Sequence, residues 1–282
     1  MSFLFGILVG FSLGLTGGGG SIFAVPLLVY GLHLPVHEAV GVSLIVVGIT
    51  ALGGALVRLR HQEVEIKAAL LFGAAGIAGA PVGAWLGGKL PGDVLLGGFA
   101  LLMLLVAARM WRQATRKPAD TKIVRARDEF SNLAEGPACR FNPAGGLTLT
   151  SRCAFVLALS GAVTGCLSGL FGVGGGFLIV PALMLVASLP IHRAVATSLL
   201  IIALISAAGT TSYLLAGRPL NLSTTALFVL GGLLGMGLGA VLSRRLAGPL
   251  LQKLFAGAMV GVAIYILLGH SVLNAATFFS KD

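Results

Sequence analysis

The stretch that decides the fold is Gly14–Leu28, GLTGGGGSIFAVPLL, in which four consecutive glycines interrupt an apolar segment. A glycine weakens a helix by about 1 kcal/mol relative to alanine, so a run of four predicts a break in the helix. The same arrangement returns 155 residues later at Gly169–Leu183, GLFGVGGGFLIVPAL. Any fold for this chain must therefore accommodate two hydrophobic segments that each break near the centre.

Composition indicates that these segments lie in lipid. The 282 residues are 57% hydrophobic and only 10% charged, whereas soluble domains carry about 25% charged residues. A membrane-spanning helix needs about 20 apolar residues. The chain offers apolar blocks at residues 2–32, 38–57, 66–88, 93–111, 153–188, 194–216, 222–243 and 249–270. The first block lacks the basic start and cleavage site of a signal peptide. We therefore expect an all-α polytopic membrane protein.

The two halves of the chain are homologous repeats. Residues 14–44 align with residues 169–199 without a gap, and 15 of the 31 positions are identical. After one extra residue, residues 76–90 also align with residues 232–246. We expect a first membrane repeat at residues 1–112, a linker at 113–150 and a second membrane repeat at 151–282. Each repeat then consists of a glycine-broken helix and about three further spans.

The basic residues indicate the topology. Nine of the nineteen Lys and Arg residues lie between Arg109 and Arg152. Such a segment beside membrane spans predicts a cytoplasmic linker, which could also bind anionic lipid, rather than a nucleic-acid surface. If the glycine-broken segments are re-entrant, the two halves are inverted and only Lys89, Arg218 and Lys281 fall outside. If every block crosses, the halves are parallel and more basic residues fall outside. The count favours inverted repeats and leaves the parallel arrangement open.

The glycine clusters are candidates for a substrate site. Irregular backbone at membrane depth is tolerated only where it faces protein or a cavity. Free N–H groups at the start of a following half-helix form a site for an anion, and transporters place substrates there, between their repeats. We expect substrate contacts from the two clusters and nearby hydroxyls: Thr16, Gly17, Gly18, Gly19, Gly20, Ser21, Ser43, Gly172, Gly174, Gly175, Gly176 and Ser198.

Two alternatives limit that interpretation. Glycines at every fourth position are typical of close helix packing, and we assign Gly6, Gly10, Gly14, Gly161, Gly165 and Gly169 to that role. Hydroxyls in a span often bond only to their own helix. This second alternative applies to Thr16 and Ser21 in the first half, to Thr164 and Ser168 in the second half, and to the matched pair Ser43 and Ser198.

The duplicated pattern G-L-x-G-x-G-G followed by a proline resembles the TauE/SafE sulfite exporter family, also called the 4-toluene sulfonate uptake permease family. The resemblance covers the chain apart from the linker. Its motif positions are Gly14, Gly17, Gly19, Gly20 and Pro26, and Gly169, Gly172, Gly174, Gly175 and Pro181. It implies a secondary transporter of sulfite, sulfoacetate or other sulfonates in a bacterial inner (plasma) membrane. The chain departs from its own pattern at Ser21, which stands where the second copy has Gly176.

Two histidines are candidates for proton coupling. His37 and His192 occupy equivalent positions in the motif L-P-[VI]-H, and histidine exchanges protons near neutral pH. The alternative is that each caps a helix or meets water at a span entrance. The next residues are Glu38 and Arg193, and this swapped charge indicates gating or orientation at a membrane edge rather than a shared carboxylate. Sodium coupling and a homo-oligomeric state are left open.

Other function classes are disfavoured. The sequence contains no HExxH motif, no pair of intramembrane carboxylates and no Ser-His-Asp set. We expect no enzyme, no metal and no other cofactor, and we expect the three cysteines to be free thiols. The predicted function is secondary transport of a small sulfur-containing anion by alternating access, coupled to protons. The alternative is an anion channel of the same architecture.

Overall fold

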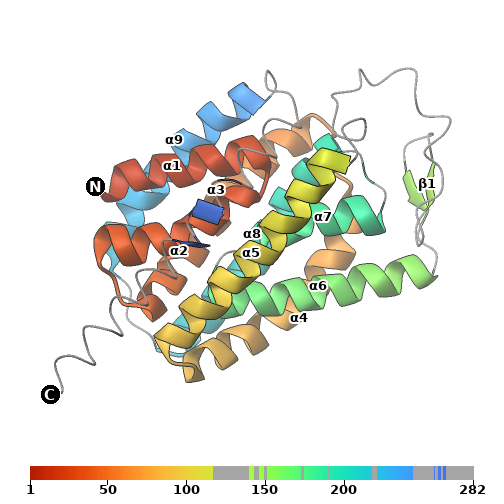
Figure 1. Cartoon of the computed structure of the whole chain (residues 1–282). Helices are drawn as coiled ribbons and strands as arrows, with labels where there is room; N and C mark the ends of the chain where they lie inside the picture. The colour runs from red at the N-terminus through yellow and green to blue at the C-terminus, as the bar shows by residue number, and fades with distance from the viewer. Residues whose placement is uncertain are drawn as a thin grey trace, which may run out of the picture.

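The fold, taken from a computed structural model, is a bundle of long helices (Figure 1). The structure describes residues 1–116, 140–142, 146–148, 151–172, 175–187, 189, 191–217, 221–243, 257, 260, 261, 263 and 264. Its long helices are α1 (Ser2–Thr16), α3 (Val36–Arg60), α4 (Ile66–Lys89), α5 (Gly92–Arg116), α6 (Ser151–Phe171), α7 (Gly176–Val186), α8 (Ile191–Leu215) and α9 (Leu222–Ser243).

Shorter elements complete the described chain. Three turns lie between α1 and α3: η1 (Gly19–Phe23), α2 (Ala24–Pro26) and η2 (Leu27–Gly31). Strands β1 (Arg140–Asn142) and β2 (Gly146–Thr148) pair antiparallel, with Phe141 opposite Leu147. This hairpin lies in the stretch that we predicted as the linker, and it is an addition to the predicted all-α class. The helical class itself is confirmed.

The helices are those of a multi-pass membrane protein. In the described part of the chain, α3, α4, α6, α8 and α9 are long and apolar enough to cross a membrane. The shorter apolar helices are α1, residues 20–31 and residues 92–108 of α5. Large apolar side chains point outward along these helices, including Leu105, Phe155, Leu238 and Val241, each more than 60% exposed. Lipid is the solvent that such a surface requires.

Both predicted helix breaks are confirmed. Helix α1 stops at Gly17 (φ +72°) and α6 stops at Gly172 (φ +70°). Each of these residues donates its N–H to the carbonyl four residues earlier, Leu13 or Ser168, at 2.8 Å. A left-handed residue after the last turn ends a helix, and glycine adopts that conformation without steric cost. We call residues 17–20 the first break and residues 172–176 the second break.

The first helix of each half packs along a helix of the other half. Helix α1 lies along α9, and α6 lies along α4 (Figure 1). A Cβ built on Gly10 would lie 1.9 Å from the Gly232 carbonyl oxygen, and one on Gly165 would lie 2.1 Å from that of Gly76. These two contacts are equivalent in the repeats. The same close approach occurs at Gly6, Gly14, Gly161 and Gly169, so the predicted packing role of these glycines is confirmed.

The contacts also define helix directions. Helices α1 and α9 run the same way, because Gly6 lies beside Phe228 and Gly14 beside Met236. Helix α3 runs the same way as α9, because Thr50 lies beside Gly232 and Gly54 lies beside Met236. Helices α1 and α3 therefore also run the same way, so the segment between them must lead the chain back to the side where α1 begins. In contrast, α3 and α8 run in opposite directions.

The antiparallel arrangement of α3 and α8 follows from a second set of neighbours. Gly41, near the start of α3, lies beside Tyr213, near the end of α8. Gly54, near the end of α3, lies beside Leu199, near the start of α8. These two helices occupy equivalent places in their repeats and form the centre of the bundle.

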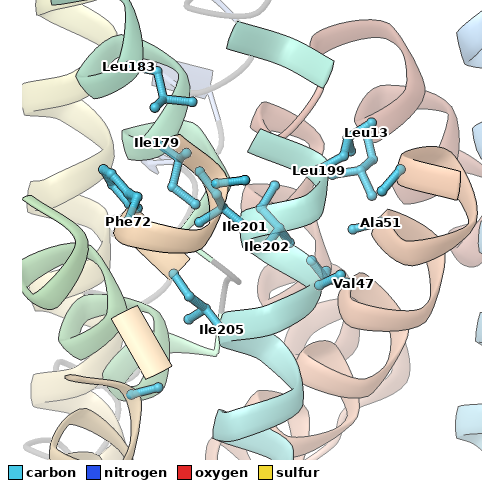
Figure 2. Packing of buried hydrophobic residues seen from close by; sticks show 14 of the residues in the cluster. Leu13, Val47, Ala51, Phe72, Ile179, Leu183, Leu199, Ile201, Ile202 and Ile205 are labelled. Carbon is cyan, nitrogen blue, oxygen red and sulfur yellow. The ribbon is translucent and has the colours of Figure 1, made fainter. Parts of the chain in front are cut away.

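The hydrophobic core surrounds α8. Figure 2 shows Ile201, Ile202 and Ile205 of α8 between two groups of side chains. One group contains Val47 and Ala51 of α3, and the other contains Phe72 of α4 with Ile179 and Leu183 of α7. All of these side chains are fully buried. The core therefore joins helices from both halves of the chain.

The cysteines differ from the prediction. Cys166 is a free thiol, but Cys153 is disulfide-bonded, so the expectation of free thiols is wrong for Cys153. A disulfide depends on two Cα atoms lying about 4.4–6.8 Å apart, and sequence spacing does not show which cysteines the fold brings that close. Cys139 lies outside the described residues.

Candidate substrate site at the two helix breaks

Each helix break is held by a serine from the other half. Ser198 of α8 donates its hydroxyl hydrogen to the carbonyl oxygen of Gly17, and Ser43 of α3 donates to that of Gly172. Both serines are fully buried and occupy equivalent positions in the repeats. The last carbonyl of a helix lacks an intrahelical partner, so these hydroxyls satisfy it. The hydroxyl oxygen of Ser198 also lies 2.9 Å from the carbonyl oxygen of Val195, one turn earlier in α8.

The breaks lie against these same two helices and against each other. A Cβ on Gly17 would lie 2.1 Å from Cγ1 of Val195, and one on Gly172 would lie 2.6 Å from Cγ1 of Val40. The two valines are equivalent in the repeats. Gly18 and Gly176 meet directly, because a Cβ on Gly176 would lie 2.6 Å from the Gly18 Cα. The structure therefore brings both predicted glycine clusters to one place.

The hydroxyls beside the first break are bonded to the backbone of their own segment. The Thr16 hydroxyl donates to the Ser12 carbonyl at 2.8 Å and accepts the Gly20 N–H at 3.1 Å. The Ser21 hydroxyl donates to the Gly18 carbonyl at 2.7 Å. These hydroxyls therefore stabilise the irregular backbone. Within the described chain the Gly18 N–H has no hydrogen-bond partner.

The second break has a different set of polar groups. Helix α7 begins at Gly176, directly after Gly175 in the left-handed conformation (φ +66°). The start of an 11-residue helix concentrates positive partial charge at this point. Thr164 bonds to the Ser160 carbonyl at 2.7 Å. Ser168 is only 1% exposed, and its hydroxyl has no hydrogen-bond partner among the described residues.

Three predicted positions are described only in part or not at all. Gly174 lies outside the described residues. Pro181 lies in α7 and His192 is the second residue of α8, but their side chains are not described. Gly19 is the first residue of η1. Pro26 is buried and precedes the π-helical turn η2. Because it has no N–H, the carbonyl four residues earlier, that of Ile22, lacks the regular helix bond.

The two histidines lie apart. His37 is half-buried in the first turn of α3, and His192 lies in the first turn of α8. Because α3 and α8 run in opposite directions, these two turns lie at opposite ends of the pair. The structure therefore does not assemble a histidine pair. Each histidine lies three residues before the valine of its helix that contacts a break, Val40 or Val195.

The two ends of the α3–α8 pair carry polar contacts whose partners we did not predict. At one end Arg193 forms an ion pair with Glu65, which also donates its N–H to the Thr197 hydroxyl at 2.9 Å. At the other end Glu38 accepts the Asn221 N–H at 3.2 Å. Glu65 precedes α4 as Asn221 precedes α9. The charge difference between Glu38 and Arg193 was the available signal, but the sequence did not show their partners.

The two glycine-broken segments carry no charged side chains. The segments 12–31 and 160–189 contain no Lys, Arg, Asp or Glu. The groups that the structure offers at the breaks are backbone N–H and carbonyl groups and serine or threonine hydroxyls. Among the described residues there is no group of three or more His, Cys, Asp or Glu side chains that could hold a metal ion. Such a site can bind a ligand through dipoles and hydrogen bonds.

Comparison with known proteins identifies the family. The family described as sulfite exporter TauE/SafE matches residues 2–266. A "Probable membrane transporter protein" of Xylella fastidiosa (strain Temecula1) is 36% identical over 267 residues, covering 93% of this chain and 92% of that protein. "Probable membrane transporter protein YunE" of Bacillus subtilis (strain 168) is 29% identical over 292 residues, covering 99% and 100%.

The comparison extends to an archaeal relative but not to known structures. "Probable membrane transporter protein MJ0441" of Methanocaldococcus jannaschii is 30% identical over 219 residues, covering 74% of this chain and 72% of that protein. No solved structure matches. The family and the bacterial relatives support a multi-pass protein of the inner membrane. The chain belongs to the TauE/SafE sulfite exporter family of membrane transporters.

Proposed function

We propose that this membrane transporter is a secondary carrier of small sulfur-containing anions, such as sulfite, sulfoacetate or another sulfonate, and not an enzyme. The observation that carries the proposal is the meeting of the two helix breaks, with Gly18 against Gly176 and each break bonded by a serine of the other half. Transporters place substrates at discontinuous helices where two repeats meet. Membership of the sulfite exporter family supports the choice of anion.

Helix directions support inverted repeats in this proposal. Helices α3 and α8 are repeat equivalents and run in opposite directions. In a parallel arrangement with a cytoplasmic linker, Arg193 lies outside and Glu65 inside. Their ion pair requires that both lie on the same side. In the inverted arrangement both lie on the cytoplasmic side, and each glycine-broken segment enters and leaves on one side.

An oxyanion suits the groups at the breaks. Backbone N–H groups at a helix start bind negative oxygens and carry no charge of their own. A site without a fixed cation holds an anion loosely enough to release it, which a carrier needs on both sides of the membrane. The Gly18 N–H and the start of α7 are the donors that we assign to the substrate.

Alternating access then operates between the two ends of α3 and α8. Opening the site toward the cytoplasm requires separation of Arg193 from Glu65, and opening it outward requires separation of Glu38 from Asn221. The two contacts lie at opposite ends, so one can open while the other stays closed. We propose proton coupling through His37 and His192, which lie one at each end.

The test is flux in proteoliposomes. Vesicles are loaded with labelled sulfite or labelled sulfoacetate, and efflux is followed with and without an imposed pH gradient. Saturable efflux that the gradient accelerates supports a proton-coupled carrier, and an imposed sodium gradient distinguishes sodium coupling. Unitary currents in planar bilayers would instead indicate the channel alternative. Absence of saturable flux for both anions, with folded protein in the vesicles, contradicts the proposal.

A further inference from the structure

A buried hydroxyl that bonds to no described residue lies in the last turn of α6, four residues before the second helix break. Ser168 is 1% exposed, and its Oγ has no hydrogen-bond partner among the described residues. Buried polar groups in proteins are nearly always hydrogen-bonded, because an unpaired one loses its bonds to water without replacement. An unpaired buried hydroxyl therefore requires an explanation, and a ligand is one.

Ser168 also departs from what helical hydroxyls ordinarily do. Serine and threonine in a helix usually bond the carbonyl three or four residues earlier. Thr16, Thr164 and Thr50 each bond the carbonyl four residues earlier. Ser168 leaves the corresponding Thr164 carbonyl without this bond. The O–H of Ser168 is therefore available to donate a hydrogen bond to a bound ligand.

The position of Ser168 is next to the start of α7. A Cβ built on Gly175 would lie 3.3 Å from the Ser168 Cβ. Gly175 is the residue that precedes α7, a helix of 11 residues whose positive end lies here. The Ser168 carbonyl accepts the Gly172 N–H at 2.8 Å, which fixes the serine in the last turn before the break. The unused donor and the helix start thus lie side by side.

The first break has no counterpart to this hydroxyl. The residue equivalent to Ser168 is Leu13, which is fully buried in the apolar core. The hydroxyls that flank the first break, those of Thr16 and Ser21, are bonded to backbone. The side-chain donors of the two breaks are therefore unequal, although their backbones follow the same pattern.

We infer that Ser168 donates a hydrogen bond to the transported oxyanion at the start of α7, and that the second break is the main substrate-binding element. The inference rests on the proposed function and narrows its site from two equivalent breaks to one. The ligand class is a small anion with a terminal oxygen that accepts a hydrogen bond, as in a sulfite or sulfonate group. The first break then shapes and closes the site.

Ser206 offers a matched control. It is a fully buried serine whose Oγ also has no hydrogen-bond partner among the described residues. It lies on α8 beside Gly48 of α3, where a Cβ on Gly48 would lie 3.0 Å from the Ser206 Cβ. This place is eight residues beyond Ser198 on the same helix, and Ser206 is not among the three atoms nearest to a Cβ at any break glycine that the structure describes. Removing either hydroxyl deletes the same atom from a buried place, but only Ser168 adjoins the proposed site.

The experiment measures saturable sulfite flux in proteoliposomes for the wild type, Ser168→Ala and Ser206→Ala. Loss of a hydrogen bond to a charged ligand is expected to raise KM about tenfold or more in Ser168→Ala. Ser206→Ala is expected to keep KM within about twofold of wild type. If Ser168→Ala fails to fold, Ser168→Cys, which keeps the side-chain size and a weak donor, is expected to raise KM by a smaller factor.

The outcomes separate this inference from the proposed function. Saturable wild-type flux with an unchanged KM in both Ser168 variants overturns the inference and leaves the carrier intact. An equal rise in Ser168→Ala and Ser206→Ala also overturns it, because the effect would then follow from any buried hydroxyl. A wild type that shows neither flux nor thermal stabilisation by sulfite or sulfoacetate overturns both.

Discussion

At the first helix break the hydroxyls of Thr16 and Ser21 are bonded to the backbone of their own loop, whereas at the second break the buried hydroxyl of Ser168 is bonded to no described residue. The backbones nevertheless agree: Gly17 and Gly172 are both left-handed, and each is bonded by a serine of the other half. Packing therefore preserves the symmetry of the repeats, and the polar side chains depart from it.

The comparison separates two kinds of constraint. Glycine is required at the end of both α1 and α6, because an equivalent valine lies against it in each half. A substrate that binds at the meeting point of two breaks needs only one set of side-chain donors. Substitutions at equivalent positions should therefore be equally destabilising in the two halves. Substitution of a side chain that only one half has should produce an effect with no counterpart in the other half.

The largest effect is expected from Gly17→Ala and Gly172→Ala. An alanine in the left-handed conformation costs about 1–2 kcal/mol, and its Cβ would clash with Val195 or Val40. We expect a clear fall in Tm and loss of transport in both variants. Thermal unfolding of purified protein in detergent and flux in proteoliposomes test this. A Tm loss confined to one variant would contradict the equivalence of the breaks.

Gly97→Ala provides the control for these variants. Gly97 lies inside α5, where a Cβ would meet no atom within 4 Å. Alanine favours a helix over glycine by about 1 kcal/mol, so Tm should stay the same or rise. A fall comparable with that of Gly17→Ala would mean that the bundle is sensitive to any added methyl group.

The next effect concerns the two ends of the α3–α8 pair. Glu65 is nearly buried beside Arg193, and removal of one partner from a buried pair costs about 3–5 kcal/mol, less where solvent reaches the pair. Arg193→Gln is therefore expected to destabilise the protein and to favour the state open at that end. Glu38→Gln keeps an oxygen for the Asn221 N–H, so its effect should be small.

Cysteine accessibility measures this difference. A single cysteine at Ser168 of the proposed site, in an otherwise cysteine-free protein, should react faster with a membrane-impermeant thiol reagent from the Arg193 end in Arg193→Gln. The same cysteine in Glu38→Gln should keep its wild-type rate. Charge exchange in Arg193→Glu with Glu65→Arg should restore Tm in part. No change of either readout in Arg193→Gln would mean that the ion pair does not hold that end closed.

A smaller and symmetric effect is expected from Ser43→Ala and Ser198→Ala. Each change leaves a buried glycine carbonyl without its side-chain donor, at a cost of about 1–3 kcal/mol. The two variants should lose similar free energies of unfolding in denaturant titrations. A difference much above about 1 kcal/mol would indicate that one serine has a second role, such as substrate contact.

Much of the fold was predictable from sequence because its signals are local. The glycine runs at residues 17–20 and 172–176 indicated the helix breaks, and the four-residue spacing of glycines such as Gly6 and Gly10 indicated close packing. Both depend on backbone conformation or helix geometry, which a short stretch determines. The repeat further predicted that Ser43 and Ser198 would be equivalent.

The site was less predictable because its contacts are long-range. Ser43 and Gly172 are separated by 129 residues, and Arg193 and Glu65 by 128. Sequence placed these hydroxyls near the glycines but did not show that they bond carbonyls. The distinction between Thr16, which is satisfied locally, and Ser168, which is not, depends on side-chain orientation. That orientation follows only from the packed structure.

The smallest effect on transport is expected at the first break, from Thr16→Val and Ser21→Ala. Both changes remove hydroxyls that bond backbone rather than a ligand, so Tm should fall modestly while KM for sulfite stays within about twofold of wild type. The pair sharpens the comparison because Ser168→Ala should show the reverse pattern, with a raised KM and little loss of Tm. If KM rises in Thr16→Val as much as in Ser168→Ala, both breaks contact the substrate, and the asymmetry of their hydroxyls then reflects local backbone stabilisation alone.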